Sequence, residues 1–311
     1  MKILALVSSK RRPDNSAMYQ ILAKDHDLKL IYLDKSKQKW LSWRLRKVNF
    51  SDYDAVISDL HFKNIHKQPY FFKTIRNLFF LEEDACQNYI QSSQWYGIFS
   101  RFYKNLPDST VMTSGYSTAE KLSREGVCSY FITKAYDHTL IKNYNRDRDI
   151  TLGFIGNIEN KVYKKRRETL LFLKKHTDLK ILKTDPGIEY VKMLNRIEYF
   201  VSADKGLGEY MIKNFEAMAA GCILCAWRQG FGEEEALGLK DLENCILYSD
   251  SNELTKKINL VSNNINLKKY ILKNSQDHAT KNFSYATQER QISATLLNTY
   301  YSRNLTPASS F

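Results

Sequence analysis

The sequence of 311 residues has little of what marks fibrous, disordered or membrane-spanning chains. Its 12 glycines and 5 prolines are too few for a collagen-like or low-complexity protein, and its hydrophobic share of 43% is too high for a disordered one. No apolar stretch reaches the roughly 18 to 20 residues of a transmembrane helix. A chain of this length can bury two cores, so we expect a globular protein of about two domains.

Cysteines are also few, and their number and spacing argue against a disulfide scaffold. The five are scattered along the chain and no signal peptide precedes them, so we expect a reducing, cytoplasmic compartment. Cys222 and Cys225 have the spacing of a redox or metal pair, but they lie in an apolar run typical of a buried strand, on which residues three apart face opposite sides. No second pair completes a zinc site, so we expect two buried thiols and not a metal or redox pair.

Acidic residues are fewer than basic residues in this sequence. Lysine and arginine together number 47 against 34 aspartates and glutamates, which gives a net charge of +13 at pH 7. A surface of this sign attracts phosphates, nucleotides, nucleic acid or an acidic membrane, and the charge alone does not choose among them.

Strand and helix patterns alternate along the chain in two successive series. In the first, strands are expected at residues 2–7, 28–33, 53–58, 77–81 and 109–113. The series restarts after a polar linker at 142–149, with strands at 150–155, 179–182, 198–201, 222–226 and 245–247 and helices at 164–176 and 210–220. The pattern predicts an α/β protein of two Rossmann-like domains, residues 1–142 and 150–285. A helical segment at 286–311 is expected to pack back on the first domain, and a ligand to bind in the cleft between the two.

The most informative stretch is residues 202–221, which has the pattern of a strand end, a glycine-containing turn and a helix. The helix is expected to begin near Tyr210 and to end at Gly221, a C-terminal glycine cap. The N–H groups and the positive dipole end at its start suit an anion, and Gly206 and Gly208 let the backbone approach closely. These features indicate a diphosphate.

Two glutamates in this stretch are seven residues apart, which is close to two helical turns. Glu209 and Glu216 are therefore expected to project from one side of the helix. A carboxylate accepts two hydroxyl hydrogen bonds at once, which suits it to the diol of a ribose or a hexose.

The segment Phe215-Glu-Ala-Met-Ala-Ala-Gly221 resembles the donor-binding signature of GT-B glycosyltransferases of the retaining, group 1 / family 4-like type. In the usual motif a first glutamate stands eight positions before the second. Here Gly208 occupies that position and Glu209 comes one residue later, so the sequence is closer to a divergent branch with a basic residue, here Lys213, before the helix glutamate. Further segments of these enzymes are resembled by residues 130–137, 153–157 and 247–254. The sequence resemblance therefore covers residues 130–258, whereas the first 129 residues resemble these enzymes only in their expected architecture.

The resemblance implies a GT-B fold, a nucleotide-sugar donor, retention of configuration and no metal. It implies that Glu216 holds the ribose and that Glu209, a candidate catalytic residue, contacts the donor sugar. Of the cations near the basic helix at 164–176, which point in every direction, at most two are expected to face the diphosphate. The expected donor-binding residues are Gly156, Asn157, Lys161, Arg166, Gly206, Leu207, Gly208, Glu209, Tyr210, Lys213 and Glu216.

The first domain is expected to bind the acceptor, with catalytic candidates where strands end. His61 is expected either to contact the donor sugar, as a histidine does in some relatives, or to be an ordinary hydrogen-bonded surface residue. Of the trio at 82–84, Asp84 is expected to point inward and the other two to be solvated. Asp147 and Asp149 form a D-x-D, but this metal signature of another glycosyltransferase fold lies in the linker and is discounted.

Residues 35–47 interleave cations with two tryptophans, a composition that suits the headgroup region of an anionic membrane. Trp40, Trp43 and Lys47 are expected on one helical face, which weakens the case for an amphipathic helix. A polybasic aromatic patch still fits an enzyme with a lipid-linked acceptor, so we predict peripheral binding to the inner face of the plasma membrane. The residues expected to contact the membrane or the acceptor are Lys39, Trp40, Trp43, Arg44 and Lys47.

The predicted function is transfer of a sugar from a nucleotide-sugar donor to a glycan or lipid-linked acceptor, of the surface polysaccharide or lipopolysaccharide type, with no nucleic-acid partner. Two alternatives stay open. The charge of +13 and the 20 tyrosines fit a protein that binds single-stranded nucleic acid, although no RRM, zinc-finger or helix-turn-helix spacing is present. The other alternative is a sensor that binds a nucleotide sugar without catalysis.

Overall fold

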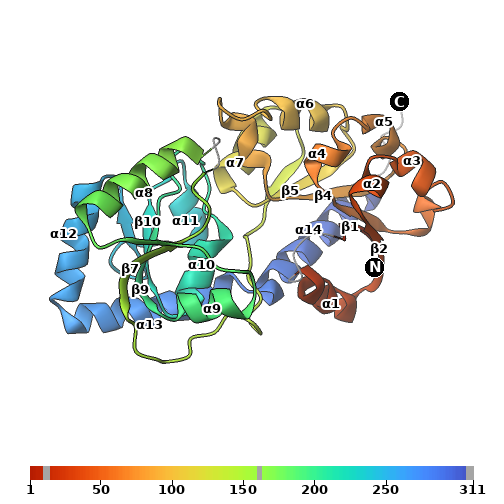
Figure 1. The fold of residues 1–311 in the computed structure, drawn as a ribbon. Helices are drawn as coiled ribbons and strands as arrows, with labels where there is room; N and C mark the ends of the chain where they lie inside the picture. The colour runs from red at the N-terminus through yellow and green to blue at the C-terminus, as the bar shows by residue number, and fades with distance from the viewer. Residues whose placement is uncertain (10–14, 160–162, 306–311) are drawn as a thin grey trace. The chain divides into compact units, whose positions relative to one another are not determined.

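The computed structural model describes residues 1–9, 15–159 and 163–305, and the chain divides into two compact units. Unit 1 consists of Met1–Ile132 and Tyr285–Phe311, and unit 2 consists of Thr133–Ser284. Each unit contains one sheet whose neighbouring strands are all parallel, with helices between successive strands (Figure 1). The predicted α/β class with two parallel sheets is therefore confirmed, and the expected linker at 142–149 belongs to unit 2.

The sheet of unit 1 has the strand order β2-β1-β3-β4-β5-β6. Its strands are β1 (Lys2–Ser8), β2 (Asp27–Leu33), β3 (Ala55–Asp59), β4 (Leu78–Glu82), β5 (Thr110–Thr113) and β6 (Ser129–Phe131). Strands β1, β3 and β4 are almost entirely buried, as expected for a parallel sheet covered on both faces. The order changes direction between β1 and β3, which makes the carboxyl ends of these two strands the ligand-binding position of such a sheet.

The helices of unit 1 pack an aromatic core and include the last helix of the chain. They are α1 (Asn15–Asp25), α2 (Lys35–Gln38), α3 (Leu41–Arg44), α4 (Phe62–Ile65), α5 (Pro69–Phe72), α6 (Ile98–Lys104), α7 (Tyr116–Arg124) and α14 (Tyr285–Leu305), with short 3-10 turns at Phe50–Asp52 and Ala85–Tyr89. Phe62 stacks on Phe99 in the core, with ring centroids 3.7 Å apart. Helix α14 lies against α1, where His26 Nε2 and Ser293 Oγ form a hydrogen bond of 2.8 Å.

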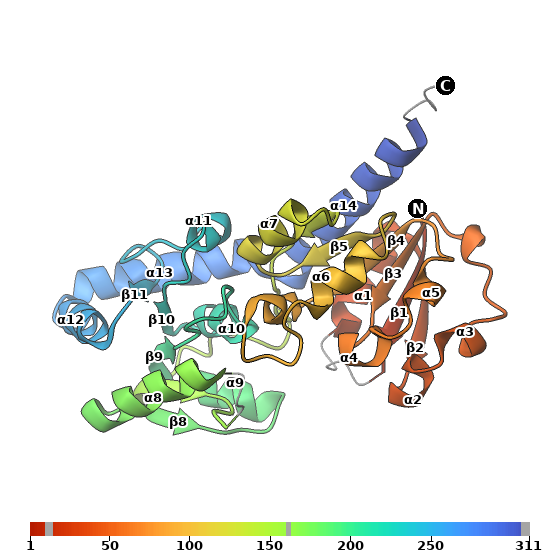
Figure 2. The same ribbon diagram turned by 90° about the horizontal axis from the view of Figure 1, so that it is seen from above.

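The sheet of unit 2 has the order β11-β10-β9-β7-β8. Its strands are β7 (Ile150–Ile155), β8 (Lys180–Leu182), β9 (Ile197–Ser202), β10 (Ile223–Trp227) and β11 (Ile246–Tyr248). Its helices are α8 (Lys164–His176), α9 (Ile188–Leu194), α10 (Ile212–Ala219), α11 (Glu233–Leu237), α12 (Ser251–Ser262) and α13 (Ile265–Asn282). Leucines of α8 and α12 enter the same hydrophobic cluster on one face of the sheet. Helix α10 packs against α13, which is visible in both views (Figures 1 and 2).

The predicted strands coincide with the observed ones to within two residues, and the basic helix at 164–176 is α8 without change. Two helix predictions need correction. The helix expected near Tyr210 begins at Ile212, because the preceding loop is held by side chains described below. The sequence pattern of residues 267–301 is typical of one continuous helix, but the structure divides this segment into α13 and α14 at Phe283 and Ser284, where Tyr136 N donates to Phe283 O at 2.9 Å.

The tryptophan-containing stretch 35–47 is also not one helix. Helices α2 and α3 are separated at Lys39 and Trp40, and Trp40 has non-helical backbone angles of φ −136° and ψ 51°. The prediction that Trp40, Trp43 and Lys47 share one helical face is therefore wrong. Among the residues that the structure describes, no helix combines the length and the apolar character of a bilayer span.

All five cysteines are free thiols, and only Cys128 is exposed. The prediction that Cys222 and Cys225 are buried is confirmed, and burial raises the pKa of Cys222 to about 11. We expect one thiol of the native protein to react rapidly with DTNB at pH 8, and five to react after unfolding. Cys128→Ala should abolish the rapid phase, whereas a rapid phase that persists in this variant would contradict the burial of the other four.

Candidate functional site

Two segments leave the sheet of unit 2 where its strand order changes direction, between β7 and β9. Gly156 and Asn157 follow β7, and the loop of residues 203–211 follows β9 and leads into α10. Ligands of parallel α/β sheets bind at this position, outside the carboxyl ends of the strands. We call these two segments and α10 the candidate site.

Asp204 fixes the shape of the loop 203–211. It is buried, and its Oδ2 accepts hydrogen bonds from Ser202 Oγ at 2.9 Å and from Asn214 Nδ2 at 2.8 Å. The same oxygen accepts the N–H of Met211, the residue that caps α10, at 3.2 Å. One carboxylate thus joins the strand end, the loop and the first turn of the helix, so the loop enters α10 in a fixed geometry.

Arg166 of α8 completes the contacts of Asp204. Its Nη2 lies 2.5 Å from Asp204 Oδ1, and only 10% of the side chain is exposed. Its guanidinium lies 4.6 Å from the ring centroid of Tyr163, and its Nε is buried without a hydrogen-bond partner. The contact of Arg166 with a diphosphate stays a prediction, while in this structure the residue holds the loop. Lys161, the other expected cation, lies outside the described residues.

The turn at 206–208 depends on its glycines. Gly206 and Gly208 have φ angles of 80° and 72°, in the left-handed region that side chains disfavour. The N–H of Gly208 donates to Gln229 Oε1 at 3.0 Å, and the N–H of Leu207 donates to Asp204 O at 3.1 Å. Leu207 itself is buried. The turn is therefore held by Gln229 on one side and Asp204 on the other.

Glu209 and Tyr210 point into the interior of unit 2. Glu209 is fully buried, and its Oε1 pairs with Lys134 Nζ at 2.8 Å; the same ammonium donates to Tyr210 O at 3.3 Å. The hydroxyl of Tyr210 donates to Glu234 Oε1 at 2.6 Å, and burial, with the nearby carboxylate, raises the pKa of Tyr210 far above its usual value. The prediction that Glu209 and Glu216 project from one side of one helix is wrong, because Glu209 precedes α10.

Lys213, Tyr190 and Glu216 form a cluster beside the end of β7. Lys213 Nζ donates to Ile155 O at 2.9 Å and lies 5.7 Å from the ring centroid of Tyr190. The hydroxyl of Tyr190 donates to Glu216 Oε2 at 2.6 Å. Glu216 keeps 9% exposure, so it is not sealed in the core. The cluster brings a carboxylate, an ammonium and an aromatic ring to the carboxyl end of one strand.

Gly156 lets β7 end directly against this cluster. A Cβ at this position would lie 3.0 Å from Phe154 Cζ and 3.2 Å from Lys213 Nζ, so a larger residue would displace the lysine. Asn157 is exposed, and its Oδ1 accepts the N–H of Glu159 at 2.9 Å. The backbone of the strand end and the ammonium of Lys213 are therefore close neighbours, an arrangement that suits an anionic group.

In unit 1 the candidate residues follow the ends of β3 and β4. His61 is partly buried, and its N–H donates to Gln38 Oε1 at 3.3 Å. The expectation that Asp84 points inward is wrong, since Asp84 is exposed and Glu82 is buried. Glu82 is the last residue of β4, and it faces the core, where Tyr103 Oη donates to its Oε2 at 3.0 Å.

The five residues expected at a membrane or acceptor lie on the surface of unit 1. Trp40 and Trp43 are 69% and 56% exposed, and Lys39, Arg44 and Lys47 are exposed as well. The guanidinium of Arg44 lies 4.3 Å from the ring centroid of Trp43. The break between α2 and α3 leaves both indoles at the surface although they share no helical face.

Several polar residues that belong to the candidate site or contact it were not predicted as site residues, and they are Lys134, Tyr190, Asp204, Gln229 and Glu234. Asp204 alone carries a sequence signal, because a polar residue two positions after a buried strand lies at the ligand-binding edge of a sheet. Among the described residues, no group of three histidine, cysteine, aspartate or glutamate side chains is arranged to hold a metal ion. In the D-x-D of residues 147–149, the Oδ2 of Asp149 forms an ion pair with Nη2 of Arg196 at 2.5 Å.

No protein-family model matches the sequence, and no curated protein sequence matches it significantly. Solved structures do resemble it. The structure of Anabaena HepE in complex with UDP aligns with 96% of this chain and with 100% of the HepE chain, with a TM-score of 0.67 and 15% identity. The structure of HepE in complex with UDP-glucose gives a TM-score of 0.66. Sucrose-phosphate synthase from Thermosynechococcus elongatus covers 97% of this chain and 100% of its own, with a TM-score of 0.65 and 11% identity. A glycosyltransferase from Rickettsia africae aligns with 96% of this chain and with 98% of its own chain, with a TM-score of 0.61 and 12% identity. The chain therefore has the GT-B fold that its sequence predicts.

Proposed function

We propose that this protein is a glycosyltransferase in which unit 2 binds a nucleotide-sugar donor. The observation that carries the proposal is the cluster of Lys213 and Glu216 at the end of β7, at the switch point of the sheet. Glu216 supplies a carboxylate for the ribose diol, and Lys213 supplies a positive charge for the diphosphate. The likeness to a protein solved with UDP and with UDP-glucose supports the same choice of donor class.

The remaining residues of the candidate site prepare it for charge that develops during transfer. When the bond between the sugar and the phosphate breaks, negative charge grows on the leaving nucleoside diphosphate. Lys213 and the amino end of α10 are fixed before the reaction, Lys213 by Ile155 O and the helix by Asp204, so they stabilise this charge without reorganising. We propose a metal-independent reaction that retains configuration.

Unit 1 is proposed to bind the acceptor, a glycan or a lipid-linked glycan of the surface polysaccharide or lipopolysaccharide type. Its exposed residues Trp40 and Trp43, together with the cations around them, support a peripheral contact with an anionic membrane on the cytoplasmic side. His61 is proposed to lie near the reacting groups because it follows the carboxyl end of β3.

Thermal shift with uridine, guanosine, adenosine and cytidine nucleotide sugars tests the donor class directly. A bound donor raises the melting temperature by an amount that grows with the ratio of its concentration to its Kd. Release of nucleoside diphosphate without acceptor then reports hydrolysis. We expect stabilisation by one base, followed by slow hydrolysis that EDTA does not abolish. Stabilisation without hydrolysis or transfer to any glycan acceptor would favour the sensor, and salt-sensitive binding to any oligonucleotide without a nucleotide-sugar response would favour the nucleic-acid-binding alternative.

A further inference from the structure

The outward face of α8 combines positive charge with exposed apolar side chains. The helix packs into unit 2 through Arg166, Leu170 and Leu173, which are buried. Leu171 and Phe172 lie on the other side of the helix and are 43% and 51% exposed. Five exposed cations stand before and after this pair, and they are Lys164, Lys165, Arg167, Lys174 and Lys175.

The carboxylates near this face are Glu168, Glu159 and, beside Phe172, Asp250 and Glu253, of which Glu253 is paired with Lys257. Glu168 is the single carboxylate of α8, and its Oε1 lies 3.7 Å from Lys164 Nζ. Glu159 lies 3.6 Å from Arg167 Nη1. Exposed pairs of this kind contribute little and are easily replaced by another anion. The face therefore keeps a positive potential around two apolar side chains.

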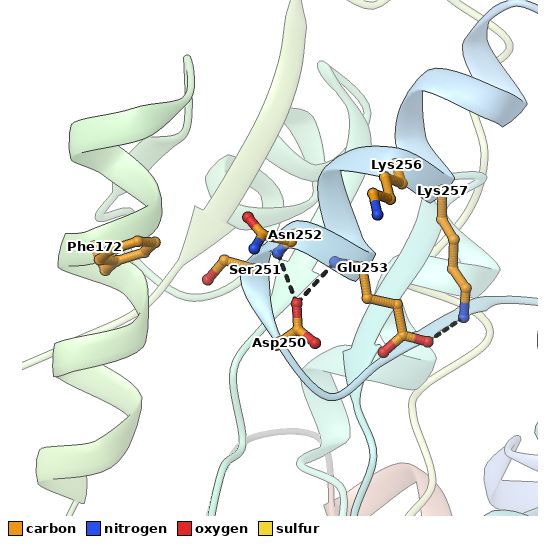
Figure 3. A pocket seen from close by; sticks show the side chains of 7 residues that line it. All are labelled: Phe172, Asp250, Ser251, Asn252, Glu253, Lys256 and Lys257. Carbon is orange, nitrogen blue, oxygen red and sulfur yellow. Dashed lines mark hydrogen bonds and ion pairs between the residues drawn. The ribbon is translucent and has the colours of Figure 1, made fainter.

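Phe172 is exposed because it borders open space and not a neighbouring helix. A hollow of about 710 Å³ lies between Phe172 and the start of α12, lined there by Asp250 and Lys256 (Figure 3). The polar groups of α12 largely satisfy one another, since Asp250 accepts the N–H of Asn252 and Lys257 pairs with Glu253. A second hollow of about 530 Å³ is also lined by Phe172, together with Lys165 and Lys205. The ring thus stands beside hollows that are lined by both lysines and carboxylates.

We propose that this face of α8 binds the surface of an anionic phospholipid membrane. Lysines and arginine on either side meet lipid phosphates, and Leu171 and Phe172 reach the boundary between headgroups and acyl chains. Two adjacent apolar side chains within a basic helix face favour a lipid surface over a soluble polyanion, because a soluble polyanion would bind through the cations alone. The proposal goes beyond the proposed function, because it gives unit 2 a membrane contact of its own that does not depend on Trp40 or Trp43.

Co-sedimentation with vesicles tests this surface. The full-length protein is mixed at low salt with vesicles of phosphatidylcholine alone or with 30% phosphatidylglycerol. We expect sedimentation with the anionic vesicles only. Lys174→Glu/Lys175→Glu should weaken it at least tenfold, because each basic residue near the surface contributes appreciably to binding. Leu171→Ser/Phe172→Ser should weaken it about fivefold at unchanged charge, a loss that a purely electrostatic contact would not show.

The matched control is Lys269→Glu/Lys273→Glu, which makes the same charge change at exposed positions of α13. Equal losses in the two charge-reversed variants would overturn the proposal in favour of diffuse attraction, and so would wild-type protein that stays in the supernatant. Binding that survives Leu171→Ser/Phe172→Ser and is matched by heparin would point to a soluble polyanion instead. Hydrolysis of the nucleotide sugar by the α8 variants should equal that of the wild type, so a failure of the membrane proposal leaves the proposed activity independently measurable.

Discussion

Replacing Lys134 with methionine is expected to lower the free energy of unfolding by about 3–5 kcal/mol. Lys134 and Glu209 form a buried pair with side-chain exposures of 7% and 0%. Removal of the ammonium leaves the Glu209 carboxylate in the interior without its counter-ion, and desolvation of that charge is the source of the cost. Urea denaturation of Lys134→Met and wild type at pH 7 measures the difference.

The double variant Lys134→Met/Glu209→Leu separates the stability of the pair from its role in the site. Replacing both charges with apolar side chains of similar size should restore most of the lost stability, because no buried charge is left unpaired. If the double variant is stable and hydrolyses the nucleotide sugar as the wild type does, the pair is structural and Glu209 takes no part in the reaction. If it is stable and binds the donor but loses turnover, the catalytic assignment of Glu209 is supported. A cost below about 1 kcal/mol for Lys134→Met would contradict the buried pair itself.

The fold was largely predictable because its strands are short apolar runs separated by polar turns. Parallel strands that are buried on both faces have this pattern, and β7 (Ile150–Ile155) has the predicted bounds without change. The errors occur where contacts that follow no helix or strand periodicity decide the local structure. Asp204 precedes Tyr210 closely, but no periodicity shows that its carboxylate will hold the loop and delay the helix to Ile212. Tyr136, which pairs with Phe283, is far from it in the sequence.

The candidate site was predictable only where a motif was present. The Glu-Ala-Met-Ala-Ala-Gly segment identified Glu216, and a strand that ends in glycine identified Gly156. Lys134 lies 75 residues from Glu209, and Tyr190 lies 26 residues from Glu216, so no helical or strand periodicity connects either pair. The orientation of Glu209 was mispredicted for the same reason. A seven-residue spacing places two side chains on one side only if both belong to the helix, and the loop contacts exclude Glu209 from it.

Glu216→Ala is expected to weaken binding of the nucleoside diphosphate about 100-fold, because two hydrogen bonds from the ribose diol to a carboxylate contribute together about 3 kcal/mol. Glu216→Gln should lose about tenfold, since an amide oxygen still accepts but carries no charge. Tyr190→Phe is the matched control. It removes the hydroxyl that donates to Glu216 Oε2 at 2.6 Å and leaves the carboxylate in place, so its loss should be severalfold at most. Isothermal titration calorimetry with the diphosphate of the base chosen by thermal shift measures all three.

The 2′,3′-dideoxy form of the same nucleoside diphosphate shows whether Glu216 acts on the ribose. Removing the hydroxyls should weaken binding to the wild type about as much as Glu216→Ala does, because both changes remove the same hydrogen bonds. The two changes should then be strongly non-additive, with Glu216→Ala binding the normal and dideoxy ligands almost equally. Additive losses would place the carboxylate away from the ribose diol. Since Glu216 is the residue by which the motif and the cluster at the end of β7 point to the same ligand, that result would remove the main support for a nucleotide-sugar donor.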